Sequence, residues 1–213
     1  TADAGSCSSR VIFNADAHPP GLEAELSARV LNGLELSLAG SWVEAEFDET
    51  RSAVGGGVLA GIRKGNRLPS VPEYQIAATA AYYFPLSFMH GAEAFFSASS
   101  QHIGSRYTQP GDQEPGAGVF RHGLAPFGGM VGVPAPGVPV GEVTTVDLEL
   151  DPYTIVNFNA GIESENWALI VFVNNAFDEN AELSFDRERG GRARLGFHTN
   201  QPRTIGGTVR RNF

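Results

Sequence analysis

The last eleven residues of the chain are the feature that most constrains its fold. Residues 203–213 read RTIGGTVRRNF, in which Ile205, Gly207 and Val209 alternate with polar or charged residues before the chain closes on Phe213. A period of two is typical of a β-strand with one apolar and one polar face. Soluble chains usually end in frayed polar residues. An alternating strand that ends on an aromatic ring instead predicts the closing strand of a membrane β-barrel.

Six further segments show strand-like patterns, and each is 9 to 14 residues long. They are Leu22–Leu31, Leu34–Phe47, Tyr74–Phe84, Gly91–Ile103, Tyr153–Glu163 and Trp167–Asn175. The first alternates strictly, and Asn32-Gly33 behind it is a strong hairpin signal. Beyond Trp42 the apolar phase slips to Val43, Ala45 and Phe47, which predicts either a bulge or emergence from a lipid layer.

The connections between these segments alternate in length without exception. They are short at 32–33, long at 48–72, short at 85–90, long at 104–152, short at 164–166 and long at 176–202. This pattern predicts an antiparallel up-and-down transmembrane β-barrel segment of about seven strands, with long loops on one side and short turns on the other. Aromatic residues near strand ends are placed like interfacial girdles. These are Trp42, Tyr82, Tyr83, Phe84, Trp167 and Phe213.

Two alternatives to this barrel stay open from the pattern alone. A soluble β-sandwich binding domain would bury Leu36, Leu38 and Ile155 in a core. A passive porin would share both the strand alternation and the terminal Phe213.

Composition narrows the class of protein further. No run approaches the roughly 18 to 20 apolar residues of a membrane helix, but a spanning strand needs only about 9–11 residues. The net charge of -9 argues against a nucleic-acid partner. The lone Cys7 allows no internal disulfide. A barrel must be exported, and the chain starts at Thr1 without a leader-like stretch, so we expect its front to be missing.

Catalytic or metal chemistry finds little support in the sequence. Five histidines (His18, His90, His102, His122 and His198) show no ligand spacing. Asp147, Glu149 and Asp151 could bind Ca²⁺, although a solvated strand explains them better. The 55–66 segment lacks the Gly-Lys-Ser/Thr of a phosphate loop, and no Gly-x-Ser-x-Gly elbow occurs. We therefore expect no catalytic residue, cofactor or metal site, and no enzyme activity.

Polar residues that alternate with the apolar ones are expected to face a hydrated interior. They are Glu23, Glu25, Arg29, Glu35, Gln75, Asn157 and Asn159.

Five short motifs, in this order, give the chain a family resemblance from about Gly21 onward. They are Gly21–Leu26 (GLEAEL), Ala45–Phe47 (AEF), Gly65–Pro72 (GNRLPSVP), Asn175–Asp178 (NAFD) and the Pro202-Arg203-Thr204 strand that ends at Phe213. In order and spacing they resemble the C-terminal part of the barrel of TonB-dependent outer-membrane receptors.

The resemblance implies a 22-stranded barrel filled by an N-terminal plug, of which residues 1–213 would be the C-terminal portion, with the plug absent from this chain. It implies TonB-energised uptake of a scarce nutrient complex, such as a ferric siderophore, through the bacterial outer membrane. The implied partners are TonB, the plug of the same protein, outer-membrane lipid and the barrel-assembly machinery, which would read Phe213 on the periplasmic side. The long loops, above all 104–152, would face the ligand.

Overall fold

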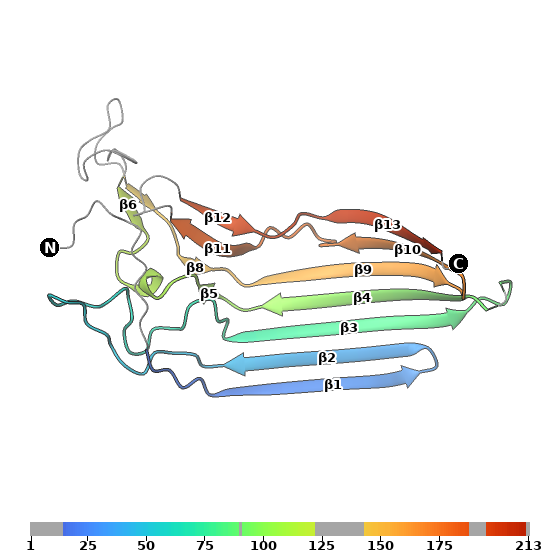
Figure 1. Ribbon diagram of the computed structural model, residues 1–213, viewed down its shortest axis with the longest axis horizontal. Coiled ribbons are helices and arrows are strands. Elements are labelled where there is room, and N and C mark those ends of the chain that lie inside the picture. Colours follow the sequence, from blue (N-terminus) through green and yellow to red (C-terminus); the bar gives the residue numbers. More distant parts are fainter. Residues whose placement is uncertain (1–14, 90, 122–142, 188–194, 212–213) are drawn as a thin grey trace, which may run out of the picture.

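Seven long strands lying side by side form the body of the molecule (Figure 1). The computed structural model describes residues 15–89, 91–121, 143–187 and 195–211. The strands form one antiparallel sheet in the order β1-β2-β3-β4-β9-β10-β13. They are β1 (Gly21–Leu31), β2 (Leu34–Val43), β3 (Tyr74–Pro85), β4 (Glu93–Ile103), β9 (Tyr153–Glu163), β10 (Trp167–Asn174) and β13 (Thr204–Arg211). Within the described ranges, no helix is long and apolar enough to span a bilayer.

The order of this sheet confirms the seven strands and the up-and-down path that the sequence predicts. β2 is four residues shorter than expected, because it ends at Val43 and not at Phe47. The phase slip beyond Trp42 is therefore no bulge. It marks the point where the chain leaves the sheet and buries Ala45 and Phe47 among the loops. Smaller differences occur in β4, which begins at Glu93 and not at Gly91, and in β10, which ends at Asn174 and not at Asn175.

The strand register gives the sheet one continuous apolar face. Across β1, β2 and β3, for example, Leu26 pairs with Leu38, which pairs with Ala78. Leu36 and Leu38 are 40% and 50% exposed, so no second sheet covers this face and the sandwich alternative is wrong for the described residues. Ile155 pairs with Gln101 and lies on the opposite, polar face, so its expected place among the apolar residues is also wrong.

Aromatic side chains lie at both ends of the apolar face. Trp42 and Tyr74 are paired at one end, and the Tyr82 and Phe84 rings stack at the other. The strands between are 8 to 12 residues long, close to the length that crosses a hydrocarbon layer. Tyr83 departs from the predicted girdle, because it points to the polar face.

The connections sort by length between the two ends of the sheet (Figure 1). The 32–33, 86–92 and 164–166 turns share one end, here called the short-turn end. Gly33 has a φ of 83° there, and its carbonyl accepts the Tyr83 amide at 2.8 Å, so the tight turn needs a residue without a side chain.

The 44–73, 104–152 and 175–203 connections share the opposite end, called the long-loop end. They contain short elements that the sequence did not reveal: β5 (Arg106–Tyr107), η1 (Pro110–Gln113), β6 (Val119–Arg121), β7 (Val143–Thr145), β8 (Glu149–Leu150), β11 (Glu182–Arg187) and β12 (Leu195–Thr199). In the described residues, β1 and β13 each pair with a single neighbour, so the sheet is open at both edges.

Candidate functional site

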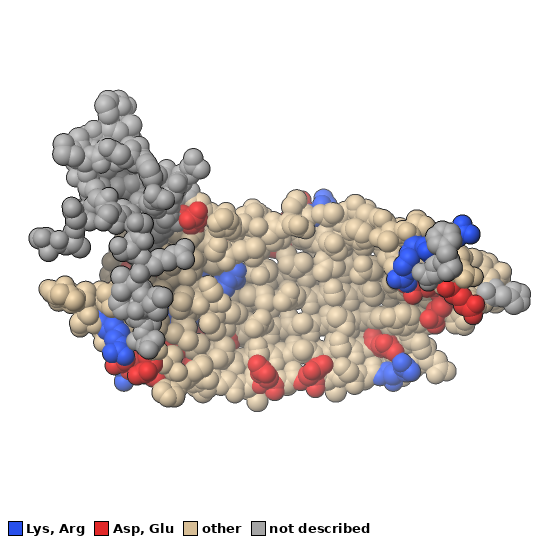
Figure 2. Space-filling model, in the orientation of Figure 1, with Lys and Arg blue, Asp and Glu red and all other residues tan. Residues whose placement is uncertain are grey.

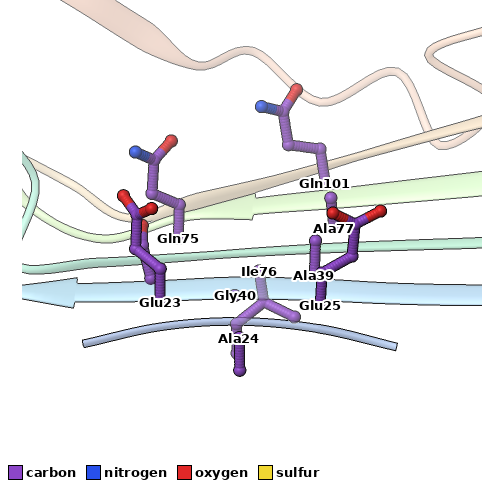
Figure 3. Close-up of a pocket in the computed structure, with 10 residues that line it drawn as sticks. Glu23, Ala24, Glu25, Ala39, Gly40, Gln75, Ile76, Ala77 and Gln101 are labelled. Atoms are coloured by element: carbon purple, nitrogen blue, oxygen red, sulfur yellow. The ribbon is translucent and has the colours of Figure 1, made fainter. Parts of the chain in front are cut away.

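The polar face of the sheet gathers carboxylates and amides near the long-loop end. Glu23 and Glu25 from β1, Gln75 from β3 and Gln101 from β4 rise together from one side of the sheet, while Ala24 lies on the other (Figure 3). They border a shallow hollow of about 430 Å³. Both glutamates are exposed, so this face offers hydrogen-bond acceptors and negative charge to whatever lies over it.

The register confirms that the predicted polar set shares this face. Its members are Glu23, Glu25, Arg29, Glu35, Gln75, Asn157 and Asn159. Two of them bond to each other, since Arg29 donates to Glu35, and Asn157 donates to the Ser99 hydroxyl at 3.3 Å on the same face. The face is therefore polar, as suits contact with water or with a polar partner.

Arg67 links residues beside the ends of β3 and β4 to a residue of β8, at the long-loop end. Its guanidinium donates to the Glu149 carboxylate at 3.2 Å and to the carbonyl and hydroxyl oxygens of Ser105, and it lies 3.6 Å from Glu73. Glu73 precedes β3, Ser105 follows β4 and Glu149 belongs to β8, which leads into β9. One half-buried arginine thus fixes the 44–73 loop against the 104–152 loop.

Glu149 completes this group of side chains. It also accepts the Ser105 hydroxyl at 2.6 Å and the Tyr107 hydroxyl at 3.1 Å. Burial and the adjacent Glu149 carboxylate raise the pKa of Tyr107. A carboxylate held by an arginine and two hydroxyls has little capacity left for a metal ion.

Arg106 ties the third long loop to the second. Its side chain is buried, and its Nη2 donates to the carbonyls of Glu182 and Leu183 at 3.1 Å, with the guanidinium over the Tyr153 ring. The Phe185 amide donates to the Thr108 hydroxyl nearby at 2.8 Å. These contacts fasten β11 to the segment that follows β4.

A small hydrophobic core holds the same loops together. Phe120, Leu148 and Phe185 are buried, and Phe197 packs against Phe185 with ring centroids 5.1 Å apart. The residues come from three different parts of the chain, two of them in the 104–152 loop. The long loops therefore form a packed platform above the end of the sheet, which we call the loop platform.

Charged side chains cluster away from the middle of the sheet. Figure 2 shows Lys, Arg, Asp and Glu gathered mainly at the two ends and along the edge where β1 runs, with few in the broad middle of the visible face. In the loop platform, Arg63 donates two hydrogen bonds to Glu114, at 3.0 and 2.7 Å. The hydrogen bond and charge of this pair raise the pKa of Arg63 and lower that of Glu114.

The three histidines within the described residues lie apart, as their spacing predicts. His18 contacts Asp48, His198 lies 3.9 Å from Asp186, and His102 lies on β4. His90 and His122 fall outside the described residues, as do Cys7 and Phe213.

The three alternating acids do not converge on one point. Glu149 points into the Arg67 group, whereas Asp147 and Asp151 lie near Glu182. Burial, with these two carboxylates, raises the pKa of Glu182. In the described ranges no cluster of three or more His, Cys, Asp or Glu could hold a metal ion. The 55–57 glycines are exposed and have positive φ values at the tip of a turn.

The antiparallel meander, with one apolar and one polar face, is the arrangement of a wall of a β-barrel. The apolar face is the outer surface of such a wall, and the long loops are packed at one end of it. The sequence profile of the family described as TonB dependent receptor-like, beta-barrel matches residues 5–176. The chain therefore belongs to this family, which comprises transport receptors of the bacterial outer membrane. No curated protein matches the chain in sequence.

Solved structures of receptors share the fold at low sequence identity. The chain is similar to the ferric yersiniabactin uptake receptor FyuA from Yersinia pestis, with a TM-score of 0.62 and 16% identity over 92% of this chain and 24% of that one. It is similar to the siderophore receptor PiuA from Acinetobacter baumannii, with a TM-score of 0.54 and 13% identity over 92% of this chain and 21% of that one. The chain thus spans about a quarter or less of the receptors that it matches.

Proposed function

We propose that the chain is the C-terminal part of the barrel of an outer-membrane receptor that imports a scarce nutrient complex, such as a ferric siderophore, with energy relayed by TonB. The observation that carries this proposal is a seven-stranded meander with every long connection packed at one end, in a chain that belongs to the receptor family. The named uptake of ferric yersiniabactin by one structural neighbour supports the substrate class. No bond is broken in this process, so the protein would not be an enzyme.

The open sheet supports the larger barrel. In lipid, each unpaired backbone group at an open edge costs several kcal/mol. The outer edges of β1 and β13 lack a neighbour among the described strands, and further strands of a larger barrel would pair with them. A barrel of 22 strands, with residues 1–213 as its C-terminal portion, would supply them.

The polar face supports a plug inside the barrel. Glu23, Glu25, Gln75 and Gln101 present acceptors and amides toward one space, and a plug domain of the same protein would meet them there. Displacement of the plug, pulled by TonB, would then open a path along this hydrated face.

The two ends of the sheet support an orientation. The loop platform would face the cell exterior and bind the ligand, and the short-turn end would face the periplasm. The chain would then end on the periplasmic side, where the barrel-assembly machinery would read Phe213.

An uptake assay tests this function. Cells that carry the complete receptor, and a deletion strain that lacks it, would be given ⁵⁵Fe-labelled siderophores under iron limitation, with and without a functional TonB. The proposal expects accumulation of at least one ferric siderophore that needs both the receptor and TonB. Passage of small sugars that depends on the receptor but not on TonB would instead establish the porin alternative.

A variant of the loop platform tests the binding step separately. Arg67→Met removes the group that holds Glu73, Ser105 and Glu149 together, and should weaken ligand binding to whole cells while the receptor stays in the membrane. Arg29→Met, which breaks an exposed pair near the short-turn end, is the matched control and should leave binding unchanged.

A further inference from the structure

The β11–β12 hairpin belongs to the 175–203 loop, the third long loop, and its strands pair irregularly near its base. Glu182 pairs with Thr199 at the start of β11. Ser184 pairs with His198, so Leu183 between them is one residue too many for the ladder. Such a bulge disrupts the pairing locally and bends the strand. The hairpin therefore has a point at Leu183 where it can bend.

The base of the same loop is held firmly. The Asn175 side chain donates to the carbonyls of Glu179 and Gln201 at 2.8 and 3.0 Å, and it accepts the Glu179 amide at 2.9 Å. The Asn200 side chain donates to the Glu179 carbonyl at 2.9 Å and accepts the Ala181 amide at 2.8 Å. These bonds join the two ends of the loop before the hairpin begins. Motion of the hairpin would thus start beyond Ala181, where the bulge lies.

Arg106 holds the bulge from the second long loop, 104–152. Its Nη2 donates to the carbonyls of Glu182 and of the bulged residue Leu183, both at 3.1 Å. Its Nη1 is buried and has no hydrogen-bond partner within the described residues. A buried N–H without an acceptor costs free energy. Opening of the hairpin would relieve this cost, because water could then reach Nη1.

Carboxylates add a second unfavourable contribution at the same place. Burial, and then the charges of Asp151 and Asp147, raise the pKa of Glu182. Within the described ranges, none of these three carboxylates forms an ion pair. Their repulsion opposes the packed position of the hairpin, whereas the Phe185 ring in the loop core and the Phe185 amide on the Thr108 hydroxyl favour it. Opposing contributions of this kind favour two positions of similar free energy.

The first long loop, 44–73, is joined to the second by paired donors and acceptors. The Gln113 side chain exchanges two hydrogen bonds with the Arg67 backbone, at 2.8 and 2.9 Å. The Ser70 amide donates to the Tyr107 carbonyl at 2.7 Å. We therefore expect these two loops to stay together when the hairpin moves.

We propose that the β11–β12 hairpin is a latch, which rotates about Leu183 between a position held by Arg106 and an open one, while the first and second long loops stay joined. Its role rests on the proposed function, which makes the loop platform the surface that a ligand meets. Opening uncovers the Arg106 guanidinium, which lies over the Tyr153 ring, and closing covers it again. The latch thereby controls the access of a ligand to this side of the platform.

Distances between spin labels on the complete receptor, without ligand, test the latch. Lys64→Cys labels an exposed position of the first loop, and Gly196→Cys labels β12, where an added Cβ would meet nothing within 4 Å. In a background without other cysteines, this pair should give two distances by double electron–electron resonance. The control pair, Lys64→Cys with Val119→Cys, joins the first and second loops and should give one. A single distance from both pairs, or two from the control pair, would overturn the proposal.

Asp151→Asn tests the cause of the opening. It keeps the size of the side chain and removes one of the like charges near Glu182, so it should reduce the open fraction of the Lys64–Gly196 pair. Glu44→Gln makes the same change in charge at an exposed position of the first loop and should leave the open fraction unchanged. An equal open fraction in both variants would refute the charge balance on which the latch depends.

The absence of ligand from this measurement keeps it apart from the test of the proposed function. Two distances in a receptor that takes up no ferric siderophore would support the latch and refute the function. A single distance in a receptor that does take one up would refute only the latch.

Discussion

The apolar face predicts that an arginine will reduce folding stability much more at one position of β2 than at the next. Leu38 is the fifth of ten residues in this strand, half exposed and flanked on its face by Leu26 and Ala78. Ala39 follows it on the polar face, opposite Glu25. If the apolar face contacts lipid, Leu38→Arg places a guanidinium near the middle of the hydrocarbon layer, whereas Ala39→Arg places it in a hydrated space beside a carboxylate.

The expected magnitude follows from the depth of Leu38. An arginine on the lipid face of a barrel costs about 2–4 kcal/mol at the bilayer midplane and about 0–1 kcal/mol near the interfaces. Leu38 is central in β2, so the upper range applies, which is roughly a 30- to 700-fold fall in the folded-to-unfolded ratio. Ala39→Arg should change the free energy of folding by no more than about 1 kcal/mol, since its charge stays in water near Glu25.

Folding into vesicles measures both variants. The complete receptor would be diluted from urea into phosphatidylcholine vesicles, and the denaturant midpoint compared for wild type, Leu38→Arg and Ala39→Arg. Equal midpoints for the two variants, or a greater loss for Ala39→Arg, would refute the assignment of the faces.

Three further changes test the turns and the loop platform. Gly33→Ala should weaken the first hairpin by about 1–3 kcal/mol, because φ is 83° and an added Cβ would lie 2.0 Å from the Tyr83 carbonyl oxygen. Amide hydrogen exchange in β1 and β2 should become faster, and unchanged exchange would contradict the prediction. Phe185→Ala should lower the stability of the loop core by about 3–5 kcal/mol, which would appear as faster amide hydrogen exchange in β11 and β12. Equal or slower exchange there would count against a packed platform. The raised pKa of Glu182 means that its ionisation opposes loop packing, so protection of β11 should fall as the pH rises from the ordinary glutamate range through the raised pKa of Glu182. Glu182→Gln should remove that pH dependence, and a dependence that persists in the variant would rule out Glu182 as its source.

The sheet was predictable because its sequence signals are local. Alternation in Leu22–Leu31 and the Asn32-Gly33 turn fix the strand, the turn and the faces without knowledge of the rest of the chain. The end of β2 was missed because Ala45 and Phe47 continue an apolar pattern for a different reason, burial among the loops.

The loop platform was not predictable, because its contacts join residues far apart in the chain. Arg67 meets Glu149, which lies 82 residues away, and Arg106 meets carbonyls 76 and 77 residues away. Nothing near Arg67 distinguishes it from a solvated arginine except its place inside the 65–72 motif. The core of Phe120, Leu148 and Phe185 likewise shows no periodicity in a stretch rich in Gly and Pro.

Surface labelling tests most directly the central claim that this sheet spans a membrane with the long loops outside. In a Cys7→Ser background, Val54→Cys places a thiol at a fully exposed position of the 44–73 loop, and Glu165→Cys places one in the 164–166 turn. A membrane-impermeant maleimide applied to intact cells should label Val54→Cys, and should label Glu165→Cys only after the outer membrane is permeabilised. Labelling of Glu165→Cys in intact cells with Val54→Cys protected, or equal labelling of both, would contradict the account.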